Sequence, residues 1–310
     1  MSGDCRISVI IPTRNRADSL EKISLPALTN QTFKDFEVII WDASDNDKTA
    51  EVVKSFPQLN IRYFKAPRVG LCSQRNDAVN VAQGDIIYFI DDDSEPSPDA
   101  LEAIYEALSS RELAGCSPSE IRIFSSKSRI KKILKKVFNK IFFLGGEGNK
   151  RAVLKSGRNE WPKQDKPGKV EWLSGGSMAF RKEVLTKYKF DEELQRFGGW
   201  ALAEDVMFTY QLFVEGFSLE ILNRGWFMHH AFPGGRMNTM SHAAASVFNY
   251  YLVWKKLILP RYKISIFTFA LAVIGTFLKV LWKSLRNGQL ELMKGFFVGF
   301  ITMLKAKKAE

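Results

Sequence analysis

A short apolar segment that ends in three aspartates constrains the fold of this chain more than any other feature. Residues 86–90 are five apolar residues in a row, two of them aromatic, which predicts a strand buried on both faces. Asp91, Asp92 and Asp93 follow at once. Adjacent carboxylates repel one another unless a cation lies between them, and open parallel sheets bind ligands at the carboxyl ends of their strands. The segment therefore predicts a divalent-metal site for a phosphorylated substrate, with a solvated acidic turn as the alternative.

The chain before this segment alternates between predicted strands and predicted helices. Strands are expected at residues 7–11, 36–41 and 61–64, and helices at residues 49–56, at 70–82 and in a segment that ends at Leu28. This β-α-β-α-β-α-β order is typical of a doubly wound α/β sheet. The sequence has no GxGxxG and no GxxxxGK[ST], so it supports neither a classical dinucleotide fold nor a P-loop.

Four blocks in the first 93 residues carry a resemblance to a known family. Residues 9–16 (VIIPTRNR), 38–47, 70–76 (GLCSQRN) and 89–93 (FIDDD) resemble family 2 glycosyltransferases in their order and spacing. The resemblance implies the GT-A fold, a mixed doubly wound sheet flanked by helices. It also implies a nucleotide-diphosphate sugar as donor, Mn²⁺ or Mg²⁺ as cofactor, and transfer with inversion at the anomeric carbon.

The same resemblance assigns roles to single residues. The donor-binding residues that it implies are Pro12, Thr13, Arg16, Asp42, Arg75, Asp91 and Asp92. Among them Asp42 would contact the base and Asp91 the ribose, while Asp93 would hold the metal. Where the family commonly has Asp-Asp-Gly-Ser-x-Asp, residues 42–47 read Asp-Ala-Ser-Asp-Asn-Asp, so the sequence does not predict which nucleotide the donor carries.

Charge is distributed unevenly along the chain, whose net charge is +11. Residues 127–170 hold 14 basic and 3 acidic residues, and residues 250–310 hold 11 and 2. Subtracting these from the totals of 45 and 34 leaves 20 basic and 29 acidic residues. An acidic body thus carries two basic segments, and we expect no nucleic acid as partner because no aromatic residues interleave the basic charges.

The first basic segment predicts an amphipathic helix. In residues 127–143 the apolar positions 130, 133, 134, 137, 138, 141 and 142 follow a helical period, and residues 127–140 contain no acid. Such a helix lies well on an anionic membrane surface. The alternative is a helix packed on the core with a solvated basic face.

The middle of the chain supplies the predicted acceptor site. Residues 145–168 are polar and rich in Gly and Lys, which predicts a loop over the site. Gly175 and Gly176 permit close approach of the backbone to a ligand, although a tight turn between strands would use them equally well. In the resembling family this glycine block lies under the donor sugar and beside the acceptor, and we add Trp200 to the acceptor-binding residues.

A pair of acids predicts the catalytic base. Glu204 and Asp205 open a predicted helix, where acids are common and mildly stabilising. The pair also matches the Glu-Asp motif of the resembling family. Inverting transfer needs one base to take the proton of the attacking hydroxyl, and we assign Asp205 to that role and Glu204 to orienting the acceptor. His229 is expected as a further metal or diphosphate ligand, with His230 as the second choice.

The C-terminal segment differs from the rest in character. Residues 264–278 carry no charge, but a full span needs about 20 apolar residues. Trp254, Tyr262, Trp282 and the flanking lysines resemble interface anchors. We expect helices that lie on or dip into the cytoplasmic leaflet, with one true span and a soluble helical cap as the alternatives.

These observations predict a glycosyltransferase domain at residues 1–235 and a membrane-associating helical segment at 236–310. The domain would comprise a nucleotide-binding half (1–115), a basic insert (125–168) and an acceptor and catalytic half (169–235). Three distant cysteines give no disulfide framework, and residues 7–11 are too short for a secretory signal, so the cytoplasmic side of the cell membrane is expected.

The predicted activity is metal-dependent inverting sugar transfer to a polyprenyl-linked acceptor or a cell-surface glycan, as in polysaccharide biosynthesis at the cell envelope. Two alternatives remain open. A nucleotide-sugar-binding protein without activity would lack the base, and Glu204–Asp205 argue against it. A nucleotidyltransferase would need a Gly-rich N-terminal loop, which residues 11–15 lack.

Overall fold

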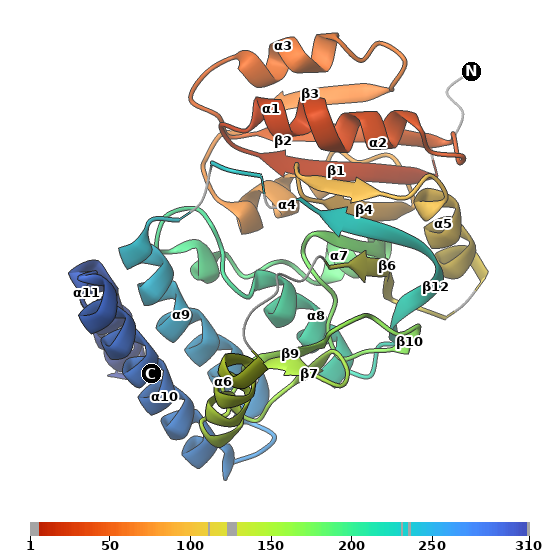
Figure 1. Ribbon diagram of the computed structural model, residues 1–310. Helices are drawn as coiled ribbons and strands as arrows, with labels where there is room; N and C mark the ends of the chain where they lie inside the picture. Colours follow the sequence, from red (N-terminus) through yellow and green to blue (C-terminus); the bar gives the residue numbers. More distant parts are fainter. Residues whose placement is uncertain (1–5, 111, 123–128, 231, 235–236, 309–310) are drawn as a thin grey trace.

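The computed structural model describes residues 6–110, 112–122, 129–230, 232–234 and 237–308. A central sheet flanked by helices forms the body (Figure 1). Its strands are β1 (Ile7–Thr13), β2 (Phe36–Asp42), β3 (Ile61–Lys65), β4 (Ile86–Ile90), β5 (Ser94–Pro96), β6 (Gly115–Ile121), β10 (Gly168–Lys169), β11 (Ser177–Arg181) and β12 (Leu219–His229). They lie in the order β10-β12-β6-β11-β4-β1-β2-β3, and β5 pairs with β12.

Helices cover both faces of this sheet and extend beyond it. The first part of the chain contributes α1 (Ala17–Ser19), η1 (Leu20–Ser24), α2 (Leu25–Thr29), α3 (Lys48–Lys54), α4 (Leu71–Val79), α5 (Ala100–Ser110) and α6 (Arg129–Ile141). The second part contributes α7 (Lys182–Lys187), η2 (Glu192–Gln195), α8 (Glu204–Val214), α9 (Thr239–Val253), η3 (Trp254–Ile258), α10 (Ser265–Asn287) and α11 (Leu290–Lys308).

The N-terminal half of the sheet confirms the predicted doubly wound pattern. β1 pairs in parallel with both β2 and β4, and β2 pairs in parallel with β3. Every residue of β1, β2 and β4 is buried, because helices lie on both faces. This burial explains why these strands read as continuous apolar runs rather than as an alternation.

The other half of the sheet is mixed and brings the glycine block to the acidic strand. β11 pairs antiparallel with β4, so that Ser177 lies opposite Ile90. The backbone N–H of Asp91 donates to the carbonyl of Gly176 at 3.4 Å. The residues before β11 therefore lie beside the aspartates that follow β4.

The prediction of a loop over residues 145–168 is wrong for part of this segment. The structure has a small sheet of β7 (Gly146–Gly148), β9 (Asn159–Pro162) and β8 (Ala152–Val153), in that order. Arg151 is 1% exposed and makes a bidentate ion pair with Asp165, at 3.0 and 2.7 Å. Its guanidinium also lies 4.8 Å from the ring centroid of Trp172. A buried ion pair orders this polar segment, and apolar periodicity cannot reveal such a contact.

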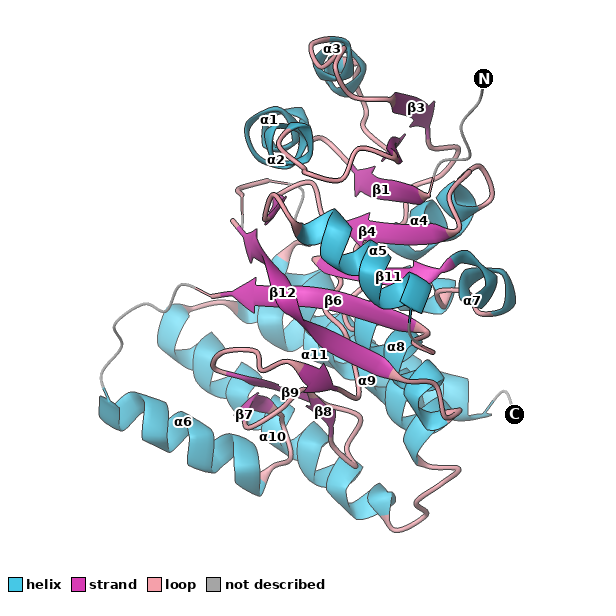
Figure 2. Cartoon of the chain, turned by 90° about the vertical axis from the view of Figure 1, so that its right-hand side faces the viewer, coloured by secondary structure: helices cyan, strands magenta, loops and turns pink. Residues whose placement is uncertain are grey.

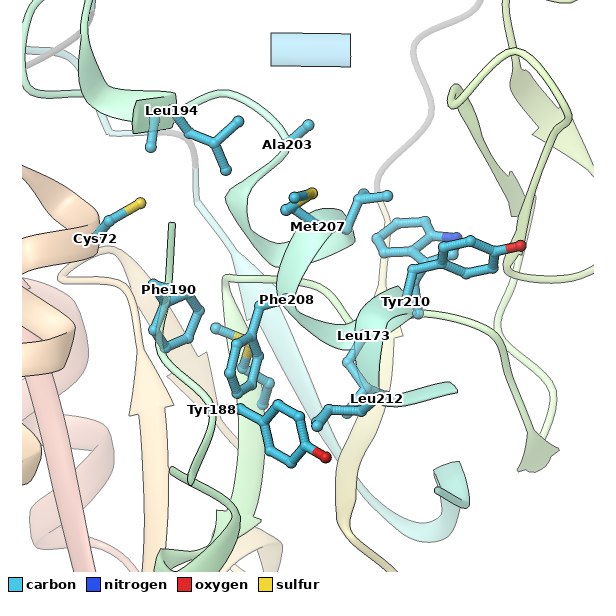
Figure 3. Packing of buried hydrophobic residues seen from close by; sticks show 14 of the residues in the cluster. Cys72, Leu173, Tyr188, Phe190, Leu194, Ala203, Met207, Phe208, Tyr210 and Leu212 are labelled. Atoms are coloured by element: carbon cyan, nitrogen blue, oxygen red, sulfur yellow. The ribbon is translucent and has the colours of Figure 1, made fainter. Parts of the chain in front are cut away.

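Aromatic packing fixes α8 against the sheet. Phe208 of α8 stacks on Phe190 with ring centroids 4.3 Å apart and meets Phe180 of β11 edge-on at 5.2 Å. Figure 3 shows Phe208 between Phe190 and the neighbouring apolar side chains of this cluster. Because this packing anchors α8, its N-terminus is held at one position beside the sheet.

The predicted C-terminal helices are present and longer than expected. α9 belongs to the main core, and α11 lies against it so closely that a Cβ added at Gly299 would be 2.4 Å from the carbonyl oxygen of Ala244. α10 is long and apolar enough to cross a membrane, and 28% of its most apolar stretch is buried. The division of the chain at residues 235 and 236 stays a prediction.

Candidate active site

The carboxyl end of β4 opens into a cleft of about 710 Å³ at the junction of the parallel and mixed halves of the sheet. The structure brings most of the predicted site residues to this cleft. Those that line it are Pro12, Thr13, Arg16, Asp91, Asp92, Asp93, Gly175, Gly176, Trp200, Glu204, Asp205 and His229. Arg75 and Asp42 do not line it.

Asp92 connects the end of β4 to the segment after β1. It is buried, accepts a hydrogen bond from Thr13 Oγ1 at 2.7 Å and pairs with Arg16 Nε at 2.8 Å. Burial raises the pKa of Asp92 to about 7, against the opposing effect of Arg16. These contacts hold the Thr13–Arg16 turn in place, and the donor-binding role of Asp92 stays a prediction.

Asp91, Asp93 and His229 form a group that could hold a metal ion. One ligand atom from each lies within 4.8 Å of the others. His229 Nε2 is 2.8 Å from Asp93 Oδ1 and 3.9 Å from Asp91 Oδ2. Carboxylate oxygens suit Mg²⁺ and Mn²⁺, and a neutral imidazole is the commonest side-chain metal ligand, so this donor set fits a divalent cation. His230, the second choice from the sequence, instead pairs with Glu95 at 2.5 Å.

The charges in this group stabilise one another. The hydrogen bond to Asp93 raises the pKa of His229 to about 9. Burial opposes ionisation of Asp93, but the hydrogen bonds and charges of His229 and Arg16 outweigh it and lower the pKa of Asp93 to about 2. A metal would take the place of the imidazole proton, since a histidine ligand must be neutral.

Arg16 ties the chain beyond β12 to the aspartates. Its Nη2 lies 2.5 Å from Asp93 Oδ2, and its Nη1 donates to the carbonyl of Gly234 at 3.0 Å. The backbone N–H of Phe232 donates to the same Asp93 oxygen at 2.9 Å. The short segment after His229 is therefore held over the acidic edge of the cleft.

Arg75, which does not line the cleft, links Asp91 of the acidic edge to Glu204. Its side chain is 1% exposed, and its guanidinium donates to Glu204 Oε1 at 3.0 Å and to Asp91 Oδ1 at 3.3 Å. It also donates to the carbonyl of Gly175 at 3.1 Å. The guanidinium thus lies between the two groups of acids, and the donor-binding role that the resemblance implies for Arg75 stays a prediction.

Asp205 is held at the N-terminus of α8 with its carboxylate at the cleft. Its Oδ2 accepts from the backbone N–H of Gly175 at 2.9 Å, and its Oδ1 accepts from the backbone N–H of Val206 at 2.7 Å. Burial raises the pKa of Asp205 above its usual range, and burial raises that of Glu204 to about 8. A raised pKa brings a carboxylate closer to the strength that a general base needs near neutral pH.

The glycine block leaves little room for a side chain at one of its two positions. A Cβ added at Gly175 would lie 3.0 Å from Glu204 Oε1 and 3.2 Å from Arg75 Nη2. The nearest atom to a Cβ at Gly176 would be 3.4 Å away, which is ordinary contact. A side chain at position 175 would therefore press on Glu204 and Arg75, which would have to shift by a few tenths of an ångström.

Asp42 does not face the cleft. It is fully buried, and its carboxylate accepts from Tyr63 Oη at 2.9 Å and from the backbone N–H of Ser44 at 2.8 Å. Its role at the base of the donor stays a prediction. Trp200, in contrast, lies at the cleft with 41% of its surface exposed.

The structure adds cleft residues that the sequence reasoning did not single out. Arg14 and Asn15 belong to a block that was recognised without roles for them. Asn15 has a positive φ of 55° and exchanges hydrogen bonds with Asp45. His242 comes from α9, far along the chain, and no sequence signal connects it to the site.

The chain is similar in sequence to several known proteins. The model of glycosyl transferase family 2 matches residues 8–188. Chondroitin synthase of Escherichia coli is 30% identical over 267 residues, which are 81% of this chain and 38% of that protein. A Campylobacter jejuni enzyme, GalNAc(5)-diNAcBac-PP-undecaprenol beta-1,3-glucosyltransferase, is 34% identical over 105 residues, 33% of this chain and 34% of the enzyme.

A solved structure supports the fold. A mannosyltransferase from Pyrobaculum calidifontis, in complex with GDP-Man and Mn²⁺, superimposes with a TM-score of 0.56 at 16% identity, over 98% of this chain and 88% of that one. At this identity the likeness concerns the fold alone. This chain spans less than two fifths of the length of the chondroitin synthase that it matches.

Proposed function

Because the chain belongs to glycosyl transferase family 2, we propose that it transfers a sugar from a nucleotide-diphosphate donor to a hydroxyl of a glycan acceptor, with inversion and with a divalent metal. The observation that carries the proposal is the arrangement of two acidic groups in one cleft. Asp91, Asp93 and His229 form one group, Glu204 and Asp205 form the other, and Arg75 joins the two through Asp91 and Glu204.

Asp205 is the proposed general base. The oxygen of the acceptor hydroxyl attacks the anomeric carbon of the donor sugar while its proton passes to the Asp205 carboxylate. The bond from that carbon to the diphosphate breaks on the opposite face, so the configuration is inverted and the nucleoside diphosphate leaves. The backbone N–H groups of Gly175 and Val206 hold the carboxylate in orientation. Glu204, fixed by Arg75, would orient the acceptor.

The residues of the acidic edge fit a divalent cation. Asp91, Asp93 and His229 would hold Mn²⁺ or Mg²⁺, which neutralises the charge that develops on a departing diphosphate. Arg16 adds a fixed cation beside Asp93. Pro12, Thr13 and Trp200 are proposed to bound the donor and acceptor ends of the cleft, which they line.

The acceptor is proposed to be a polyprenyl-linked glycan or a growing surface glycan. Supporting this, one relative is named for an undecaprenol-linked substrate and another is a chondroitin synthase. We further propose that the protein works at the cytoplasmic side of the cell membrane and that nucleic acid is not a partner. The segregation of basic charge into residues 127–170 and 250–310 supports a membrane surface as the partner.

A donor screen tests the proposal. Purified protein with Mn²⁺ is offered a panel of nucleotide sugars together with glycan and lipid-extract acceptors, and release of nucleoside diphosphate is measured. We expect release from one donor, dependent on metal, and a loss of about 10²–10⁴-fold in Asp205→Asn, as for removal of a general base. Donor binding measured by calorimetry should survive in Asp205→Asn and weaken in Asp93→Ala.

The outcomes separate the proposal from its alternatives. Donor binding without release, in the presence of every acceptor, would indicate a binding protein without activity. Release of pyrophosphate from a nucleoside triphosphate would indicate a nucleotidyltransferase. Full activity in Asp205→Asn would refute the assignment of the base.

A further inference from the structure

Two helices far apart in the sequence lie side by side on the outside of the molecule. Figure 2 shows α6 alongside α10 at the edge farthest from β1–β3. A Cβ added at Gly275 would lie 2.4 Å from Cβ of Phe142, and Lys279 Nζ lies 5.8 Å from the ring centroid of Phe138. The residue numbers of the contacts run in opposite directions, so the two helices are antiparallel.

One row of side chains on α10 packs against the rest of the protein. A second row of apolar side chains, here called the bare row, is exposed to solvent along most of the helix. The packed row includes Phe269, which stacks on Trp254 at 4.3 Å, and Thr276, whose hydroxyl accepts from Arg158 at 2.9 Å. The bare row follows a helical period and consists of Phe267, Leu271, Ile274, Leu278, Trp282 and Leu285. Its ends are 68% and 77% exposed, and it is about 27 Å long at 1.5 Å per residue.

α6 carries a second bare apolar row. Of the apolar stripe predicted from the sequence, Phe138 and the next-turn Phe142, just after the end of α6, are partly buried where they meet α10. The remaining members stay exposed, which are Ile130, Ile133, Leu134, Val137 and Ile141. Helical periodicity in an antiparallel pair directs this row to the same outer side as the bare row of α10. The alternative of a helix packed on the core by its apolar face therefore does not describe α6.

The charged side chains on the two helices themselves have a single sign. The described residues of α6 and α10 include no Asp or Glu. Lysines flank both rows, and they are Lys131, Lys132, Lys135, Lys136, Lys140, Lys279 and Lys283. Exposed apolar area framed by lysines fits the headgroup and acyl boundary of an anionic bilayer.

We propose that α6 and α10 form a docking surface for an anionic phospholipid bilayer, with α10 lying in the membrane plane rather than crossing it. This inference rests on the proposed function, since it places the same cleft at the membrane that carries its acceptor. A spanning α10 would have to give up the Trp254 and Arg158 contacts of its packed row. A second copy of the chain fits less well, because lysines would face lysines across the interface.

The position of the cleft agrees with this orientation. His242 of α9 lines the cleft. α9 lies against α10, because Arg158 donates both to the carbonyl of Ser246 on α9 at 2.8 Å and to the hydroxyl of Thr276 on α10 at 2.9 Å. Docking through this surface would hold the cleft near the headgroups, where the sugar of a lipid-linked acceptor would be presented.

Sedimentation of the full-length protein with vesicles tests the surface. Binding to phosphatidylcholine vesicles with 30% phosphatidylglycerol, a composition chosen at roughly the charge of anionic membranes, should exceed binding to phosphatidylcholine alone and fall with salt. Phe267→Glu should weaken binding by at least about tenfold. Phe213→Glu, at a 39% exposed phenylalanine on α8, is the matched control and should bind like the parent. Equal loss in both variants, or no preference for anionic vesicles, would overturn the proposal.

Depth measurements separate a flat helix from a span. A fluorophore is attached to single cysteines introduced as Phe267→Cys, Ile274→Cys and Leu285→Cys, with Cys5→Ser in the background. A helix in the membrane plane gives about equal quenching depth at all three positions, whereas a span places Ile274→Cys deepest and would refute the flat orientation. A concentration-dependent dimer without lipid that occludes these labels would instead assign the face to a second copy.

Activity on a soluble glycan acceptor keeps the two proposals distinguishable. Phe267→Glu should retain parental transfer to that acceptor, since Phe267 does not line the cleft. Loss of vesicle binding with full soluble activity supports the docking surface. Absence of transfer in the parent protein, with vesicle binding intact, would count against the proposed function and leave the surface standing.

Discussion

Replacing Arg75 by methionine should destabilise the fold more than any comparable loss of a surface arginine. Arg75 is 1% exposed and pairs with Glu204 and Asp91, whose side chains are 9% and 31% exposed. Where the remaining carboxylates are ionised, removing one partner of a buried ion pair costs about 3–5 kcal/mol, because a buried charge is left without compensation. At about 2–4 °C per kcal/mol for a chain of this class, the melting temperature should fall by roughly 6–20 °C.

The loss should depend on pH in a defined direction. Burial raises the pKa of Glu204 to about 8, and the charge of Arg75 acts to lower it. A carboxyl whose pKa is raised on folding contributes stability at low pH and loses it as pH rises through the folded value. Without Arg75 the cost of ionising Glu204 increases, so Arg75→Met should differ from the parent less at pH 5 than at pH 8.

Urea unfolding in EDTA at both pH values measures this effect. Arg224→Met is the matched control, because Arg224 is 42% exposed and pairs with the exposed Asp99, Glu102 and Glu106. Exposed pairs contribute about 0–1 kcal/mol, so the control should lose little. Adding Glu204→Gln to Arg75→Met should recover part of the loss. Equal losses of unfolding free energy in Arg75→Met and Arg224→Met, or a loss in Arg75→Met that does not change with pH, would refute the reasoning.

Three further predictions concern the cleft. His229→Ala should weaken Mn²⁺ binding by about tenfold or more and reduce the preference for Mn²⁺ over Mg²⁺, measured by titration calorimetry; unchanged preference would exclude the imidazole as ligand. The transfer rate should fall on acidification at a pH above the usual carboxyl range, because Asp205 must be ionised and burial raises its pKa; a flat profile from about pH 5 to 8 would contradict this. Gly175→Ala should slow transfer by about tenfold with little loss of melting temperature, because its Cβ would press on Glu204 and Arg75; parental kinetics would show that the block tolerates a side chain.

The parallel half of the fold was predictable because its physical signal is local. Strands buried on both faces must be apolar along their whole length, and residues 7–11, 36–41 and 86–90 show this in the sequence. The amphipathic stripe of α6 is local as well, since its period needs only thirteen residues to be seen. The family resemblance then indicated which acidic residues belong to the predicted site.

The contacts that complete the site could not be read from the sequence. Arg75 and Glu204 are 129 residues apart, and no sequence pattern around either residue indicates that they pair. Arg151 and Asp165 order a segment that composition assigned to a loop. His242 reaches the cleft only because α9 packs into the main core. Long-range ion pairs leave no periodicity, so they appear only when the chain is folded.

Arg75 also explains why the two acidic groups can share one low-dielectric region. Asp91 and Glu204 each lie where burial raises the pKa, and their like charges would repel if nothing lay between them. One guanidinium, with donors in a rigid fork, reaches both carboxylates and the Gly175 carbonyl at once, whereas a lysine would offer a single point charge. The position of Glu204 is thereby coupled to that of Asp91, so a shift of the Asp91 carboxylate would be transmitted to Glu204 through a single side chain.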